Sequence, residues 1–322
     1  MRVAVVIPNG NGRHLLADCL GSLRRQTFRD FRTLLVDNVS TDGSVEYVRA
    51  EFPEVAVLPL GRNGIFAATV NAGIRATSSE LVVALNNDTE AEPTWLAELV
   101  AALDRHPDAA AATSKLLLFD RRDTLHSAGD FFGLDGMPGS RGVWTRDDGR
   151  YDGDELVFGA SGAAAVYRRS ALADVGLFDE SLGAYCEDVD LNLRLRLAGY
   201  QIAFAPRARV YHRLSATGGG PIASYFTGRN FLTVIAKDLP APILRRHWPK
   251  IVRRQLAMTL DSLRHGREPA ARAKLRGQLH GLAGLPRALV RRREVARKTR
   301  VPTDKIEWWF AQADRPIGAR RP

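Results

Sequence analysis

The apolar run Val3-Ala-Val-Val-Ile7 is the first of four short hydrophobic stretches in the N-terminal third of the chain. Short runs rich in Val, Ile and Leu are typical of buried strands. Between them lie segments whose apolar residues recur every three or four positions, which is the helical period. The other runs are Thr33-Leu-Leu-Val36, Val55-Ala-Val-Leu58 and Leu81-Val-Val-Ala-Leu85, and the helical segments are 15–23, 44–49 and 66–76.

This alternation predicts an α/β fold with a Rossmann-like, mostly parallel sheet flanked by helices on both faces. Ligands of such sheets bind beyond the carboxyl ends of the strands. We therefore expect the functional residues directly after each strand.

The second half of the chain predicts two further strands, Leu156 to Val166 and Gln201 to Tyr211. Residues 189–197 alternate apolar and polar side chains like a strand, but their Leu and Arg content favours a helix. In that helix Asp190 and Arg194 would form an i,i+4 pair.

Helical patterns dominate from residue 221 onward, which predicts two parts: residues 1–220 as a catalytic domain and residues 221–322 as a helical C-terminal extension. The extension shows two apolar stripes at helical spacing. They are Leu244, Trp248, Ile251, Val252, Leu256, Leu260 and Leu263, and then Leu275, Leu279 and Leu282.

Charge is divided unevenly between the two parts. Residues 1–220 hold 23 Lys/Arg and 29 Asp/Glu, a net of −6, whereas residues 221–322 hold 23 and 7, a net of +16. This pattern favours an acidic catalytic body with a basic arm for an anionic surface. Together with Trp248, Trp308, Trp309 and Phe310, the arm could rest on anionic lipid headgroups. The alternative is a well-solvated helical tail.

Composition excludes several classes. Two cysteines, Cys19 and Cys186, make no disulfide framework and no zinc motif. No stretch approaches the roughly 18 apolar residues of a membrane span, and Val3–Ile7 is too short for a signal peptide. We expect a cytoplasmic protein, with a peripheral position at the inner face of the plasma membrane as a further option.

Polar residues follow the first, second and fourth strands. Gly10-Asn-Gly12 resembles a dinucleotide turn, but Leu15 occupies the place of the third small residue, which argues against a classical NAD site. Asp37 ends a buried strand, where its carboxylate can bind a base or a ribose. Asp88, in Leu85-Asn-Asn-Asp-Thr-Glu90, offers a hard cation an oxygen ligand, and Asn86 is close enough to reach a ribose.

Two more groups carry chemistry further along the chain. Tyr185-Cys-Glu-Asp-Val-Asp190 places three carboxylates at a predicted helix N-terminus, which suits a general base. Helix capping explains the same residues equally well. His212 ends the last strand, where it is either structural or a metal or phosphate contact. Tyr225 and Arg229 could bind phosphate or acceptor, or simply lie on a helix surface.

The ordered set of motifs resembles glycosyltransferase family 2, the inverting nucleotide-sugar transferases of GT-A fold. The resemblance covers about residues 1–240 and is strongest to rhamnosyltransferase-like members that build bacterial surface polysaccharides. The matching segments are Val5-Val-Ile-Pro8, Val36–Ser44, Asn63-Gly64, Asn71-Ala-Gly73, Leu85–Thr89, Gly159-Ala-Ser-Gly162, Val175–Glu180, Glu187–Asp190, Tyr211-His212, Tyr225 and Arg229-Asn230.

The resemblance implies a role for each matching residue. Asp37 would contact the base, Asp188 would be the general base, and Asp88 with His212 would hold Mg²⁺ or Mn²⁺. The remaining nucleotide-sugar contacts that it implies are Pro8, Asn9, Asn63, Asn86, Glu187 and Arg229. Two departures stand out. Asn9-Gly-Asn11 lacks the aromatic residue that usually neighbours the base, and Asn86 replaces the first Asp of the D-x-D motif, leaving one fewer charge on the metal.

The predicted function is transfer of a sugar from a nucleotide-diphospho-sugar to an acceptor hydroxyl, with dTDP-rhamnose as the implied donor and a saccharide or lipid-linked saccharide as acceptor. Two alternatives stay open. A sugar-nucleotide pyrophosphorylase would share the sheet, but Gly10-Asn-Gly-Arg13 is only a faint triphosphate loop. A nucleic-acid binder could use the basic arm, although no recognised nucleic-acid motif accompanies the charge.

Overall fold

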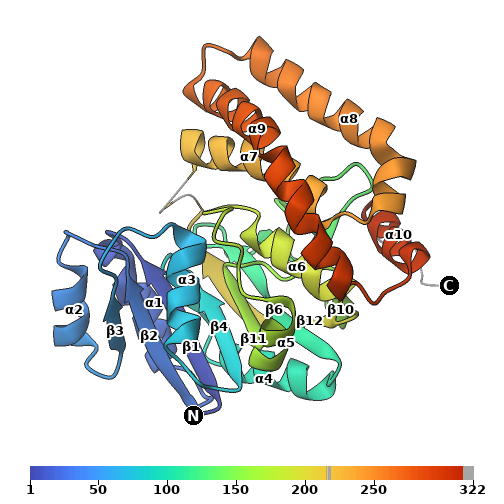
Figure 1. The fold of residues 1–322 in the computed structure, drawn as a ribbon. Coiled ribbons are helices and arrows are strands. Elements are labelled where there is room, and N and C mark those ends of the chain that lie inside the picture. Colours follow the sequence, from blue (N-terminus) through green and yellow to red (C-terminus); the bar gives the residue numbers. More distant parts are fainter. Residues whose placement is uncertain (215, 217–218, 315–322) are drawn as a thin grey trace.

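The computed structural model describes residues 1–214, 216 and 219–314, and it is built around one mixed sheet with helices on both faces (Figure 1). The sheet order is β10-β12-β6-β11-β4-β1-β2-β3, with β5 paired to β12 and β7 to β6. Its parallel N-terminal half consists of β1 (Val3–Asn9), β2 (Phe31–Asp37), β3 (Ala56–Pro59) and β4 (Leu81–Leu85).

Alternating residues of β1 reach the two faces of the sheet, as the pleat of a strand requires. Val5 packs in a cluster with α1 (Arg13–Arg24), whereas Val6 packs in the opposite cluster with α3 (Phe66–Arg75). The predicted α/β fold with helices on both faces is therefore confirmed. The first cluster also holds residues of α2 (Ser44–Glu51) and α4 (Trp95–Arg105), and the second holds residues of α5 (Arg169–Val175) and α6 (Glu187–Leu197).

The other half of the sheet departs from parallel order. β11 (Ala164–Arg168) runs antiparallel between β4 and β6 (Ala109–Leu118), and β6 pairs in parallel with β12 (Gln201–His212). The predicted strand from Leu156 to Val166 is wrong as one element. It is split into β10 (Leu156–Val157) and β11 by a turn over 159–162, which is bound by side chains of α6.

Shorter strands complete this half. A two-stranded ribbon of β8 and β9 stands apart from the main sheet. The bounds are β5 (Thr89–Ala91), β7 (Leu125–Ser127), β8 (Asp130–Phe132) and β9 (Pro138–Ser140).

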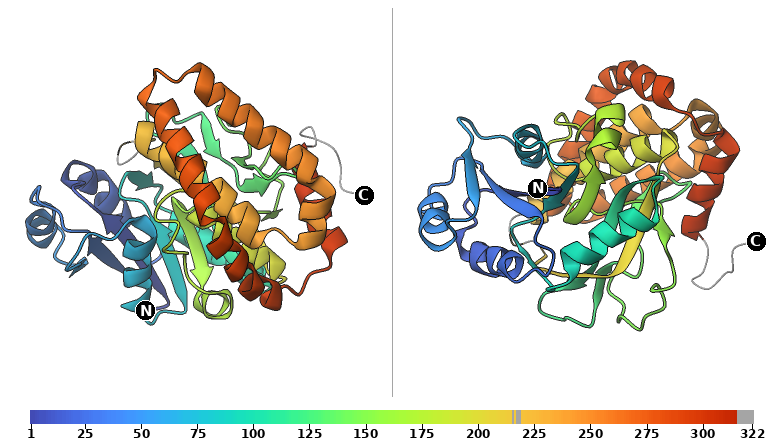
Figure 2. Two further views of the ribbon diagram at one scale, coloured as in Figure 1. Left: turned by 45° about the horizontal axis from the view of Figure 1, so that its top comes forward. Right: turned by 90° about the horizontal axis from the view of Figure 1, so that it is seen from below.

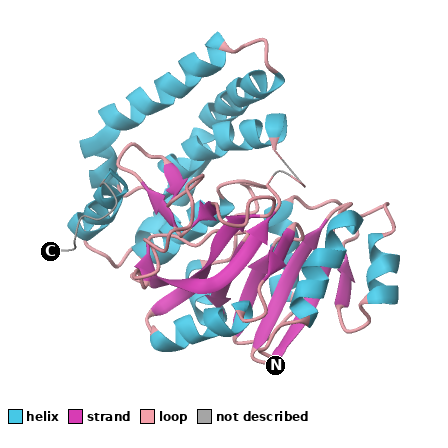
Figure 3. Cartoon of the chain, turned by 180° about the vertical axis from the view of Figure 1, so that it is seen from behind, coloured by secondary structure: helices cyan, strands magenta, loops and turns pink. Residues whose placement is uncertain are grey.

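The C-terminal part is helical, as predicted, and lies on the side of the molecule away from β1–β3 (Figures 1 and 3). It comprises α7 (Gly220–Asp238), α8 (Ala241–Arg264), α9 (Pro269–Lys298), α10 (Thr303–Ala311) and a final 3-10 turn, Gln312–Asp314. No helix among the described residues is both long enough and apolar enough to span a bilayer.

The helices α7 and α9 cross in close contact, side by side in both views of Figure 2. A Cβ at Gly277 would collide with the carbonyl oxygen of Tyr225, so only glycine allows this approach. The predicted boundary near residue 220 coincides with the start of α7. The division into domains stays a prediction.

Candidate functional site

The first part of the site is a polar cluster at the carboxyl ends of β1 and β2. Register places Asn9 opposite Asp37, and the Asn9 amide lies 3.4 Å from Asp37 Oδ1. Asn87 donates a 2.8 Å hydrogen bond to Asn9 Oδ1, which ties in the turn after β4. A Cβ at Gly12 would meet the side-chain ends of Asn87 and Asn9, so a larger residue here would displace these two amides. The structure thus joins three strand ends in one cluster, as expected of such a sheet.

The loop after β2 is shaped around the buried Asp37. The backbone N–H of Ser40 donates to Asp37 Oδ2 at 3.1 Å, and Ser40 Oγ accepts from Asn9 at 3.2 Å. Val39 adopts a left-handed φ of 58°, which is strained for a β-branched residue. Asn63 joins through a 3.0 Å hydrogen bond with Asn38. Strain of this kind concentrates at ligand-binding loops.

The second part of the site is a buried pair, Asp88 and His212. Asp88 lies on the turn before β5, and antiparallel pairing of β5 with β12 brings in His212, whose Nε2 is 3.1 Å from Asp88 Oδ1. The backbone N–H of Arg213 also donates to the carbonyl oxygen of Asp88 at 2.9 Å. The structure therefore brings together the two residues that the resemblance assigns to a metal.

His126 on β7 is a neighbour that sequence reasoning missed. Its Nδ1 lies 3.1 Å from Nδ1 of His212, so one of these two nitrogens must carry the proton that the other accepts. Burial, with a smaller contribution from His212, lowers the pKa of His126 to about 4. A neutral His126 can accept a proton donated by His212 Nδ1, which leaves the His212 Nε2 lone pair facing Asp88.

The side chains of Asp88 and His212 fit a divalent cation that would take its remaining ligands from a diphosphate. Two ligands at about 2.1 Å and at right angles lie about 3.0 Å apart, close to the 3.1 Å between Asp88 and His212. The side-chain oxygen of Asn86 is buried and has no hydrogen-bond partner among the described residues. Within that same part of the chain, no three His, Cys, Asp or Glu side chains converge on one point. The set suits a shared ion better than an all-protein cage.

The third part is the N-terminus of α6. Tyr185 and Cys186, just before it, both have a left-handed φ, 62° and 68°. The buried Asn230 amide holds this strained turn by approaching the carbonyl oxygens of Leu182, Ala184 and Tyr185 at 2.6–3.0 Å. The Arg229-Asn230 motif thus supports the turn that precedes the acidic residues.

Asp188 is held by backbone groups on both oxygens. Gly162 donates its N–H to Oδ2 at 2.9 Å, and Val189 donates to Oδ1 at 2.8 Å. One turn later Asn192 binds both the N–H and the C=O of Ala160. Asp188 and Asn192 of α6 both form hydrogen bonds with the 159–162 turn, and these bonds fix the orientation of the Asp188 carboxylate.

The adjacent carboxyl groups of Asp188 and Glu187 differ in what shifts their pKa. Burial raises the pKa of Asp188, and the backbone N–H groups of Gly162 and Val189 oppose that rise. Burial, followed by the charge of Asp188, raises the pKa of Glu187 well above its ordinary value. A raised pKa makes the Asp188 carboxylate a stronger base, and the two backbone N–H groups stabilise its charged form, which favours it over Glu187 for proton abstraction.

Asp130 on β8 is the second residue, after His126, that the sequence analysis did not single out. Burial, with the charge of Asp188 as the next cause, raises its pKa to about 7. Ser127 and Ser140 each donate a 2.8 Å hydrogen bond to its Oδ1. Asp130 also exchanges both backbone hydrogen bonds with Gly159, so it borders the turn that holds Asp188.

Tyr185 lies within electrostatic reach of two parts of the site, the turn that carries Asp88 and the first residue of α6, Glu187. Burial raises the pKa of Tyr185, and the charges of Glu187 and Asp88 add to the rise. Glu187 and Asp88 thus both act on one phenol, which indicates that the N-terminus of α6 and the turn after β4 border the same region.

The remaining predicted residues are placed as follows. Pro8 lies in β1, opposite Val36. The Arg229 guanidinium donates hydrogen bonds to the carbonyl oxygens of Ser181 and Leu182, at 3.0 and 2.5 Å. Its predicted contact with phosphate stays a prediction, as do the ligand contacts of the other residues.

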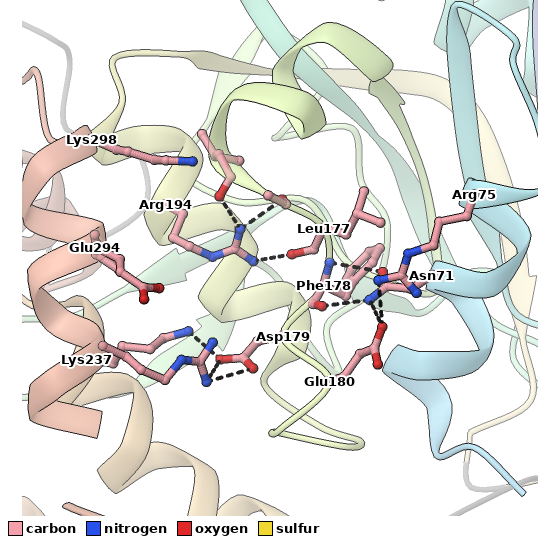
Figure 4. A pocket seen from close by; sticks show the side chains of 14 residues that line it. Asn71, Arg75, Leu177, Phe178, Asp179, Glu180, Arg194, Lys237, Glu294 and Lys298 are labelled. Atoms are coloured by element: carbon pink, nitrogen blue, oxygen red, sulfur yellow. Dashed lines mark hydrogen bonds and ion pairs between the residues drawn. The ribbon is translucent and has the colours of Figure 1, made fainter. Parts of the chain in front are cut away.

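A cavity of about 590 Å³ lies elsewhere, between α3, the 175–180 loop, α6 and α9 (Figure 4). Three of its charged groups pair with one another: Lys237 with Asp179 at 2.6 Å, and Arg291 with the same carboxylate at 2.8 Å. None of the predicted site residues lines it. We assign this cavity to the junction of the helical extension with the catalytic body.

An open α/β sheet with these groups along its carboxyl edge defines a glycosyltransferase of GT-A fold. A sequence model of Glycosyl transferase family 2 matches residues 4–176, and the chain belongs to this family. Mycobacterium tuberculosis N-acetylglucosaminyl-diphospho-decaprenol L-rhamnosyltransferase is 30% identical over 254 residues, which are 72% of this chain and 82% of that relative. The predicted family and glycosyltransferase activity are confirmed.

Solved structures show the same fold. Staphylococcus aureus TarS 1-349 in complex with UDP-GlcNAc has a TM-score of 0.59 at 19% identity, covering 97% of this chain and 92% of that one. The mannosyltransferase PcManGT from Pyrobaculum calidifontis, in complex with GDP-Man and Mn²⁺, has a TM-score of 0.53 at 16% identity, covering 97% and 80%. The chain spans 43% of a longer TarS chain. The predicted GT-A fold is thereby confirmed.

Proposed function

We propose that this glycosyltransferase moves a sugar from a nucleotide-diphospho-sugar to an acceptor hydroxyl in one displacement, with inversion at the anomeric carbon. Two observations carry the proposal: the Asp188 carboxylate is held by backbone N–H groups on both oxygens, and Asp88 and His212 form a buried pair. One group is suited to take a proton, and the other to neutralise a departing diphosphate.

Asp188 acts as the general base. It accepts the proton of the acceptor hydroxyl while that oxygen forms a bond to the anomeric carbon. The bond between the anomeric carbon and the diphosphate oxygen breaks, and the nucleoside diphosphate leaves. Asp188 then returns the proton to solvent. No covalent enzyme intermediate is needed, so a single base is sufficient.

Asp88 and His212 would hold Mg²⁺ or Mn²⁺, with Asn86 two residues before Asp88 and His126 in contact with the His212 ring. The ion supplies positive charge to the diphosphate oxygens as they become the leaving group. Asp37, Asn9 and Pro8, with Asn63 at the rim, form the wall for base and ribose. Glu187 and Arg229 complete the donor side.

The rhamnosyltransferase relative supports a narrower assignment. We test dTDP-rhamnose first as the donor, and a lipid-linked saccharide, as in that relative's name, as the acceptor. This assignment places the reaction in bacterial cell-surface polysaccharide or glycolipid synthesis.

A thermal-shift screen of dTDP-, UDP- and GDP-sugars, each with and without Mn²⁺, tests donor binding. At about 100 times Kd, binding adds about 2.7 kcal/mol to the free energy of unfolding, a shift of several degrees. We expect one nucleotide class to shift the midpoint, more with Mn²⁺ than without. Asp88→Asn should lose the Mn²⁺ increment, whereas Asp304→Asn, exposed on α10, should keep it. Absence of any shift would count against the proposal.

A further inference from the structure

An exposed apolar row runs along α8. Its spacing of three and four residues keeps the row within an arc of about 120° of the helix. The side chains are between 43% and 58% exposed, although Ile251 on a neighbouring face is buried. Helices that pack on a protein core bury such rows. The row consists of Trp248, Val252, Leu256, Leu260 and Leu263.

A second row lies on α9, within an arc of about 100°. It consists of Leu279, Leu282, Leu289 and Val290, which are between 50% and 67% exposed. The two helices follow each other along the chain and occupy the same side of the molecule (Figures 1 and 2). Two uncovered rows on one side of a chain mark an interaction surface rather than scattered exposure.

Both helices are strongly basic. Together α8 and α9 carry 15 Lys/Arg and two Asp/Glu. Among the described residues, only Arg246, Arg254 and Arg291 of these cations pair with a carboxylate. The unpaired ones include Arg245 and Arg253, which at 100° per residue lie within and directly beside the arc of the α8 row. The surface therefore offers apolar and cationic side chains together.

This surface is firmly attached to the helix that carries Asp188. Lys237 of α7 is buried against Asp179 and Asp190, and Asp190 belongs to α6. Arg291 of α9 reaches Asp179 at 2.8 Å. The close crossing of α7 with α9 completes the link. The two basic helices thus hold a defined position relative to the site.

We propose that α8 and α9 form a docking surface for an anionic lipid bilayer. A bilayer presents negative headgroups above an apolar layer, which matches cations beside half-exposed Leu and Trp. A second copy of the chain would bring the same positive charge and be repelled. The inference rests on the proposed function in one respect, because a lipid-linked acceptor would then lie in the plane on which the enzyme docks.

The test is co-sedimentation of the full chain with vesicles of equal parts phosphatidylglycerol and phosphatidylcholine. We expect binding to these vesicles, little binding to pure phosphatidylcholine, and release at about 0.5 M salt. Leu256→Ser/Leu260→Ser should weaken binding at least about tenfold. Val143→Ser/Trp144→Ser, at exposed positions of the catalytic body, is the matched control and should bind like the wild type.

The outcomes separate the docking surface from the catalytic proposal, because the vesicles contain neither donor nor acceptor. Equal binding by both double variants, or no binding to anionic vesicles, overturns the docking surface and leaves donor binding untouched. Light scattering supplies the other decisive result. A wild-type dimer that Leu256→Ser/Leu260→Ser converts to monomer would assign the rows to self-association and overturn the lipid assignment.

Discussion

Replacing Asp188 by asparagine removes the proposed base and changes little else. The side chain keeps its size, and its amide oxygen can still accept one of the two backbone N–H groups, from Gly162 or Val189. Loss of the other hydrogen bond costs about 1 kcal/mol. Removal of a buried charge, whose pKa burial has raised, offsets part of that cost. We expect the free energy of unfolding to change by less than about 1 kcal/mol.

The catalytic effect should be far larger. General-base catalysis contributes about 10²- to 10⁴-fold, which corresponds to about 2.7–5.4 kcal/mol of barrier. Glu187→Gln is the comparison one residue away, and Gln keeps the side-chain oxygen with which position 187 is proposed to contact the donor. Burial, followed by the charge of Asp188, raises the pKa of Glu187 well above its ordinary value, which works against its charged form, so a neutral amide changes this position less than position 188. Its loss of turnover should stay below about tenfold.

The assay measures release of nucleoside diphosphate at saturating donor and acceptor, alongside thermal unfolding of each variant. We expect kcat of Asp188→Asn to fall at least about 100-fold while its melting temperature stays almost unchanged. Turnover within tenfold of wild type in Asp188→Asn, or a larger loss in Glu187→Gln, would refute the assignment of the base.

Three further predictions concern stability, pH and metal. Lys237→Met leaves buried carboxylates without their cation and should cost about 3–5 kcal/mol in chemical denaturation, whereas the exposed Lys250→Met should cost under about 0.5 kcal/mol. Because Asp130 has a pKa raised to about 7, the folded state holds its proton where the unfolded chain does not. Stability is therefore lost as pH rises from about 4 to 7. Asp130→Asn should abolish up to about 4 kcal/mol of that loss. The melting temperature of the variant relative to that of the wild type should therefore rise from pH 5 to pH 8. His126→Leu should weaken Mn²⁺ affinity about 10- to 100-fold by calorimetry, and His126→Gln, which keeps an acceptor, should weaken it less; equal affinities would contradict the role of the His126–His212 contact.

Much of the catalytic body could be predicted from the sequence because its signals are local. The strands of the parallel half and the helices between them are confirmed, as is the ion pair of Asp190 with Arg194, at 2.6 Å. Asp37 and Asp88 follow their strands directly, so a general rule about sheet edges was enough to single them out.

What escaped prediction depends on pairing between distant segments. His126 reaches His212 only because β7 pairs with β6, which in turn pairs with β12. Asp130 meets the 159–162 turn through one isolated bridge to Gly159. The break in the predicted strand 156–166 did have a local signal, since Gly159 and Gly162 interrupt it, and glycine inside a strand often marks a bend.

The C-terminal stripes illustrate a different limit. The apolar period correctly predicts helices, but Ile251 is buried while Trp248 and Leu256 on the same stripe are exposed. Periodicity identifies an apolar side without saying what covers it. Only packing against α7 and the turn between β8 and β9 separates the covered part from the open row.

The most direct test of the central claim is the stereochemistry of transfer. Purified protein, Mn²⁺, dTDP-rhamnose and an N-acetylglucosaminyl-diphospho-lipid are incubated together, and the anomeric configuration of the product is determined by NMR. A single displacement with Asp188 as base predicts one released dTDP for each sugar transferred and an inverted anomeric centre. A product with retained configuration, or release of pyrophosphate instead of dTDP, would contradict it.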